Sequence, residues 1–189
     1  MIGTILSPIN TTHLMTSKKL LFLLLVPLLA FSQNKMQYKH DKTYPATPNW
    51  NFISENYALT GEVMVQIAKV ETGGILKLAV STTNPEFIIK GTVYIYLTDN
   101  TIITCTDKGD FESQGDTITS YFVLSNKEMQ QIKKTNIQSI RFNIQGKSNS
   151  FSSQVGNFTA INKKSFYKTN YNNQIEIFET AAAIKSIYP

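Results

Sequence analysis

The stretch 117–144 constrains the fold more than any other part of this chain. Residues 117–124 are rich in β-branched and aromatic side chains and alternate with the period of a strand. Ser125 and Glu128 then have the S-x-x-E spacing of a capping box, which predicts that a short helix begins at Ser125. Every second residue of 140–144 is apolar, so a further strand follows, with one face in the core and one in water. The stretch therefore predicts two strands with a capping helix between them.

The same alternation recurs in five other segments, which are 63–68, 76–81, 87–97, 101–106 and 155–161. Turn residues separate most of them, so about seven strands are joined mainly by hairpins. This pattern predicts a mainly β (α+β) fold, built as an antiparallel sandwich or a curled sheet. A right-handed parallel crossover through the short helix is the alternative connection.

A second helix is predicted at the end of the chain, over residues 173–188. Asn173 and Glu176 repeat the capping-box spacing. One apolar stripe follows at helical intervals, formed by Ile177, Ala181, Ile184 and Tyr188. We expect this helix to pack on the sheet of its own domain, and the alternative is that it docks in the groove of a partner protein.

The N-terminal part has the pattern of a secretory signal peptide. Lys18 and Lys19 precede the ten-residue apolar run 20–29, and small residues follow it up to Ser32. We therefore predict a signal peptide over 1–32, cleaved after Ser32, with Met15 as an alternative start of translation. The apolar run is shorter than the ~20 residues that cross a bilayer, so no membrane span is expected after cleavage.

The predicted localisation is periplasmic or secreted, without a lipid anchor, because no cysteine stands directly after the apolar run. Residues 33–49 are polar, contain Pro45 and Pro48 and show no period, which predicts an extended lead-in. Residues 50–189 are then expected to form a single β-rich domain, since a chain of 189 residues with 42% hydrophobic residues can build one core.

Charge and cysteine content exclude several functions. Cleavage removes Lys18 and Lys19 but no acid, so the formal net charge falls from +5 to +3. The chain has a single arginine, Arg141, whereas nucleic-acid binders cluster basic residues on one face, so no nucleic acid is expected as a partner. Cys105 is the only cysteine, which rules out an internal disulfide and predicts a small buried side chain.

Most catalytic constellations are also excluded. The chain contains only two histidines, and His13 belongs to the predicted signal peptide while His40 lies in the predicted lead-in. One histidine outside the core cannot supply a Ser-His-Asp or Cys-His relay. A zinc site of the usual His and Cys kind needs at least three such ligands and would have only His40 and Cys105. No cofactor is therefore predicted, apart from the metal considered next.

Four acids crowd one predicted loop, over residues 107–116, and these are Asp107, Asp110, Glu112 and Asp116. Their oxygens could hold Ca²⁺, although the spacing does not match an EF-hand loop. The same carboxylates could supply a glycosidase with an acid and a nucleophile, but such pairs usually face each other across a cleft. The plainer interpretation is a solvated acidic turn.

A basic and aromatic segment precedes the predicted last helix and contains Lys163, Lys164, Phe166 and Tyr167. Interleaved charges and rings could bind a glycan or an envelope protein. Tyr94 and Tyr96, on one face of the strand over 87–97, are further candidates for this surface. The alternative is a linker whose rings rest on the sheet and whose lysines stay in water.

The AFSQ junction and the run SYFVLSNKEMQQIKKTNIQSIRFNI resemble those of small exported proteins of the Bacteroidota without an assigned activity. The resemblance implies an envelope or secreted protein and supplies no catalytic residue. We expect an exported, non-catalytic domain with a binding or envelope-structural role. The alternatives are a carboxylate- or Ca-dependent hydrolase centred on 107–116, and a subunit that docks through its C-terminal helix.

Overall fold

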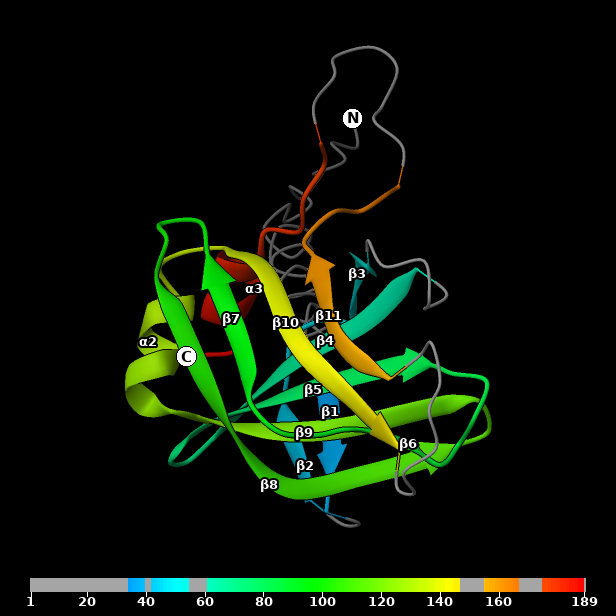
Figure 1. The fold of residues 1–189 in the computed structure, drawn as a ribbon. Helices are drawn as coiled ribbons and strands as arrows, with labels where there is room; N and C mark the ends of the chain where they lie inside the picture. Colours follow the sequence, from blue (N-terminus) through cyan, green and yellow to red (C-terminus); the bar gives the residue numbers. More distant parts are fainter. Residues whose placement is uncertain (1–33, 40–41, 55–60, 147–154, 167–174, 189) are drawn as a thin grey trace, which may run out of the picture. The chain divides into compact units, whose positions relative to one another are not determined.

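A computed structural model describes residues 34–39, 42–54, 61–146, 155–166 and 175–188 of the chain (Figure 1). The described residues are mainly strand, and their strands all pair antiparallel, which confirms the mainly β prediction. The predicted signal peptide and its cleavage site lie outside these residues.

The strands of the main sheet are β3 (Trp50–Ser54), β4 (Glu62–Val70), β5 (Gly73–Ser81), β6 (Phe87–Ile89), β7 (Val93–Leu97), β8 (Ile102–Gln114), β9 (Thr117–Ser125), β10 (Ile137–Gly146) and β11 (Gly156–Ile161). Before them comes a separate hairpin of β1 (Lys35–Tyr38) and β2 (Lys42–Pro45). Two helices are described, α2 (Asn126–Ile132) and α3 (Thr180–Ser186).

Eight of these strands close into a barrel, in the order β3-β4-β5-β9-β8-β7-β10-β11. Closure depends on β11, which pairs with β10 on one side and with β3 on the other. The predicted sandwich is therefore wrong, because the curled sheet has joined its own ends and these eight strands leave no sheet edge. The parallel crossover is wrong as well, since β9 and β10 are not neighbours in the sheet.

The interior of the barrel is filled by large apolar side chains. Phe52, Phe122 and Phe142 project into it from β3, β9 and β10 and are at most 1% exposed. Inward rows of valine, isoleucine and leucine surround them on β4, β5 and β7. An eight-stranded barrel is just wide enough for its own side chains or one small ligand, and here side chains take the space.

Helix α2 begins where the sequence predicts. The Ser125 hydroxyl accepts a hydrogen bond from the Glu128 amide at 3.3 Å, and the Glu128 carboxylate accepts one from the Ser125 amide at 2.5 Å. This capping box satisfies two amides that would otherwise lack a partner at the helix start. The apolar stripe of α2, Met129 and Ile132, is buried in the barrel core.

The predicted C-terminal helix over 173–188 is wrong in its extent, because α3 begins only at Thr180. Asn173 lies outside the described residues. The amide of Phe178 donates to the Asn162 side chain at 2.8 Å, and the carbonyl of Glu176 accepts from the Lys164 amide at 2.9 Å. Backbone groups that are bonded to another segment cannot form the first turn of a helix.

The shortened helix nevertheless packs on its own domain, with Ile184 and Ile187 buried. The hydroxyl of Thr180 accepts the Ile137 amide at 2.8 Å, which ties the start of α3 to the start of β10. Neither α2 nor α3 has the length and apolar character of a membrane-spanning helix, and this holds for the described residues only.

The predicted strand over 87–97 is two strands, β6 and β7, separated at Gly91. Gly91 has a φ of +87°, a value that favours glycine, and its amide donates to the Asp107 carboxylate at 2.7 Å. The residue that breaks the strand is thus bonded to a side chain of β8.

The prediction of an acidic loop over 107–116 is wrong. β8 continues to Gln114, so only the short turn before β9 remains of that loop. A bulge between Asp107 and Asp110, with Gly109 at a φ of +73°, shifts the register with β9 and interrupts the alternation that would have revealed a strand.

The predicted lead-in over 33–49 contains the β1–β2 hairpin, which lies on the outside of the barrel (Figure 1). Met36 and Ala46 of this segment are each 1% exposed and form a second apolar cluster with Ala68 and Ile75. Ala46 also forms an isolated bridge with Ala68 of β4. Four-residue strands are too short for a recognisable period, so the sequence gives little sign of the hairpin.

Candidate functional site

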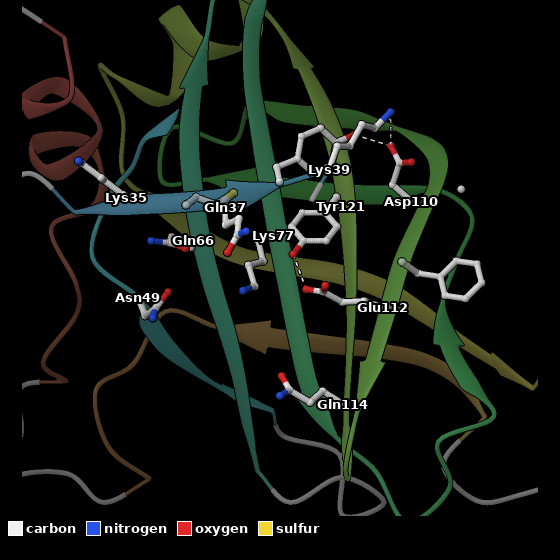
Figure 2. A pocket seen from close by; sticks show the side chains of 14 residues that line it. Lys35, Gln37, Lys39, Asn49, Gln66, Lys77, Asp110, Glu112, Gln114 and Tyr121 are labelled. Atoms are coloured by element: carbon white, nitrogen blue, oxygen red, sulfur yellow. Dashed lines mark hydrogen bonds and ion pairs between the residues drawn. The ribbon is translucent and has the colours of Figure 1, made fainter. Parts of the chain in front are cut away.

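A hollow of about 620 Å³ lies on the outer face of the barrel, beside the hairpin (Figure 2). One side is β1, the other is the part of β8 that follows the bulge, and outward side chains of β4, β5 and β9 form the floor. The alternation of each strand places these floor residues opposite to the core. The hollow therefore lies between the β1–β2 hairpin and neighbouring strands of the barrel wall.

Three side chains form the floor as a row of direct cross-strand neighbours. Gln66 of β4 is the register partner of Lys77 of β5, and Lys77 is the partner of Tyr121 of β9. Gln66 is 6% exposed and donates from its amide to the Thr47 carbonyl at 2.9 Å. The ammonium of Lys77 lies 6.0 Å from the centroid of the Tyr121 ring. The floor thus combines an amide, a cation and an aromatic ring.

Two tyrosine–carboxylate pairs form the β8 side. The Tyr38 hydroxyl donates to Asp110, and the Tyr121 hydroxyl donates to Glu112 at 2.5 Å. The two rings lie 5.0 Å apart, tilted by 53°. Figure 2 shows the Tyr121–Glu112 pair beside Lys77, and the Asp110–Lys39 pair at the outer end.

These pairs shift the pKa of both tyrosines and of Asp110. Burial, with the hydrogen bond to Glu112, raises the pKa of Tyr121, and burial with the bond to Asp110 raises the pKa of Tyr38. The Tyr38 hydrogen bond and the nearby Lys39 ammonium, 3.2 Å from Asp110, lower the pKa of that carboxyl below 3.8. Asp110 is thus a hydrogen-bond acceptor and an anion throughout the neutral range.

The lowered pKa of Asp110 predicts how stability changes with pH. A depressed carboxyl pKa contributes stability that is complete above about pH 4 and is lost as the pH falls through the native pKa. We expect Asp110→Asn to lower the Tm by about 1–2 °C at pH 6 and by less at pH 2. Thermal unfolding at both pH values measures this, and a larger effect in acid would contradict it.

The four predicted metal ligands do not share one site. Asp107 accepts the amides of Gly91 and Gly109, each at 2.7 Å, and so holds the bulge of β8. Asp116 lies in the turn before β9 and does not line the hollow, whereas Asp110 and Glu112 do. No group of three or more His, Cys, Asp or Glu is arranged for a metal ion among the described residues. Calcium binding stays a prediction without further support.

The predicted basic and aromatic surface also lies away from the hollow. Lys163 and Lys164 follow β11, and the Lys164 ammonium is 3.5 Å from the Glu176 carboxylate. Phe166 lies against Gly61, where an added methyl group would meet its ring at 2.3 Å. Tyr167 lies outside the described residues.

Tyr94 and Tyr96 lie on the outer face of β7, between β8 and β10. Tyr94 is 36% exposed, so α3 does not cover it. The exposed Ile102 is the register partner of Tyr96, and Arg141 is the partner of Tyr94. This face is separate from the hollow and contributes none of its lining residues.

Sequence reasoning missed most of the residues that line the hollow. Tyr38 and Lys39 come from the hairpin, and Lys77 comes from a strand that was predicted for its apolar row only. Tyr121 lies on the outward row of β9 and yet is only 7% exposed in the structure, so another segment covers it. Nothing in the sequence shows that β1 is this segment.

No protein-family model matches the chain, and no curated protein or solved structure matches it significantly. The function is therefore inferred from the groups that line the hollow.

Proposed function

We propose that this protein is an exported, non-catalytic domain that binds a saccharide in the hollow beside β1. The observation that carries this proposal is the kind of side chain gathered there. Planar amides line the hollow together with the two tyrosine–carboxylate pairs, and these amides are Gln37, Asn49, Gln66 and Gln114. Sugar hydroxyl groups both donate and accept hydrogen bonds, so they fit amides, which do both, and carboxylates, which accept.

The carboxylates favour binding over hydrolysis. A glycosidase needs one carboxylic acid with a raised pKa, and the pKa of Asp110 is lowered. Asp110 and Glu112 are also two residues apart on the same strand, so they project to the same side and do not face each other across the hollow. The hydrolase alternative therefore has less support than binding.

The third alternative, docking through the C-terminal helix, also has less support. Its apolar residues Ile184 and Ile187 are buried in the protein's own structure, and Ile184 belongs to the barrel core. A helix that already uses its apolar side chains has little surface left for the groove of a partner. The proposed export depends on the predicted signal peptide over 1–32.

Calorimetric titration of the purified protein with oligosaccharides tests this function. The panel contains neutral chains (cello- and xylo-oligosaccharides) and acidic chains (oligomers of galacturonan, alginate and hyaluronan). We expect at least one to bind. Asn49→Ala and Gln114→Ala should each weaken that binding by about five- to tenfold, because each removes a hydrogen bond worth about 1 kcal/mol.

Gln138→Ala is the matched control, since Gln138 is an exposed amide on β10 that does not line the hollow. It should bind as the unmodified protein does. Failure of the whole panel to bind would reject the proposal. Equal binding by the Asn49, Gln114 and Gln138 variants would show that a saccharide binds elsewhere.

A further inference from the structure

The hollow has more lysines than carboxylates, and we infer that the saccharide bound there carries an acidic group that contacts Lys77. This inference rests on the proposed function and adds the chemical class of the ligand. Five charged side chains line the hollow, and they are Lys35, Lys39, Lys77, Asp110 and Glu112. The partners of these side chains show which charges are available to bind a ligand.

Both acids already have partners within the protein. Asp110 accepts the Tyr38 hydroxyl and pairs with Lys39 at 3.2 Å, while Glu112 accepts the Tyr121 hydroxyl at 2.5 Å. Lys35 and Lys77 have no ion-pair partner among the described residues. Because three lysines and only two carboxylates line the hollow, its net charge is positive, and the lysines outside any ion pair of the described residues are Lys35 and Lys77 (Figure 2).

Among the lysines of the hollow, Lys77 is the one expected to bind an anion most strongly. It is half-buried in the middle of the floor, with the buried Gln66 on one side and the buried Tyr121 on the other. Its cross-strand neighbours limit how far its stem can move, and they reduce the water around it. A partly desolvated cation without a fixed carboxylate binds an incoming anion more strongly than a fully hydrated one.

The two carboxylates of the hollow restrict the ligand further. Asp110 and Glu112 would repel a chain with a negative charge at every position. A chain that combines acidic with neutral rings avoids this, because its acidic group can lie at Lys77 while neutral hydroxyls face the two carboxylates. An acidic peptide offers the charge but few hydroxyls, so the amide-rich lining fits it less well.

Methyl esters of the acidic oligosaccharides provide the test, since esterification removes the charge and keeps the sugar. We expect an acidic chain, with alternating hyaluronan oligomers as the preferred probe, to bind about tenfold more tightly than its own ester. Raising NaCl from about 50 to about 500 mM should reduce this preference only in part, because a partly buried charge is screened less than an exposed one.

Lys77→Met keeps the apolar stem and should abolish the preference for acid over ester while leaving binding of the ester within about twofold. Lys108→Met is the matched control, because Lys108 is an exposed lysine of β8 outside the hollow, and it should keep the preference. Unchanged thermal unfolding of both variants shows that the fold is retained.

The outcomes separate this inference from the proposed function. If neutral chains or esters bind as tightly as the acids, the acidic ligand is rejected and saccharide binding stands. If no member of the panel binds, both are rejected. Tighter binding of hexaglutamate than of any acidic sugar, with loss in Lys77→Met, would assign the site to acidic peptides instead.

Discussion

Replacing Phe122 by alanine is expected to lower the free energy of unfolding by about 3–5 kcal/mol. Phe122 projects into the barrel from β9, is 0% exposed and pairs in register with Leu76 of β5. Removing its ring would leave a cavity among side chains held in place by a closed sheet, so the surroundings can relax only in part. Urea unfolding followed by circular dichroism measures the change.

Phe111→Ala is the control for this variant, because Phe111 lies on β8 and is 48% exposed. Its loss should change the free energy of unfolding by less than about 1 kcal/mol. An effect of Phe122→Ala as small as that of Phe111→Ala would mean that the interior is loosely filled. The barrel itself would then be a candidate ligand cavity.

Gly73→Ala is expected to cost about 3 kcal/mol or more. Gly73 begins β5 with a φ of +148°, and a methyl group added there would lie 2.0 Å from the carbonyl oxygen of Leu124. Its register partner is Ser125, the cap of α2. The substitution would force β5 and β9 apart at the point where the helix begins.

Gly156→Ala is a close control for the backbone angle, since Gly156 has a φ of +141° and no atom within 4 Å of an added methyl group. This substitution should lower the free energy of unfolding by about 1–2 kcal/mol, which is the cost of the unfavourable backbone angle alone. Comparison of the two variants in urea unfolding isolates the steric contact. Equal effects would contradict the close approach of β5 to the end of β9.

Local patterns predicted the parts of the fold that local chemistry determines. The alternation in 117–124 and 140–144 and the capping box at Ser125 each depend on neighbours within a few residues, and each corresponds to an observed element. Closure of the sheet depends on β11 pairing with both β3 and β10, and β3 is far from β11 in the sequence. No local signal reports such a pairing.

The candidate site was harder to predict for the same reason. Lys77 and Tyr121 lie on strands that are distant in the sequence, and they line the hollow together with Tyr38 of a hairpin that has no sequence period. Asp110 and Glu112 were recognised as candidates, but as loop acids, because a bulge obscured the strand that carries them. Both acids accept a hydrogen bond from a tyrosine hydroxyl, and the sequence shows neither pair.

The barrel and the hollow have separate roles. The interior contributes stability through apolar side chains, and the outer face carries the amides, tyrosines and charges that are proposed to contact a ligand. Core substitutions should therefore reduce stability, and substitutions in the hollow should reduce affinity. The proposed function depends on this division.

Amide chemical-shift mapping tests most directly whether the ligand binds in the hollow and not in the barrel interior. Protein labelled with ¹⁵N is titrated with the tightest-binding acidic oligosaccharide of the panel, and shift changes are plotted on the structure. We expect the largest changes in β1 and around Lys77, Glu112 and Tyr121, with small changes in β10 and β11. Changes concentrated at Tyr94 and Tyr96, at α3 or along the inward rows of the barrel would contradict it.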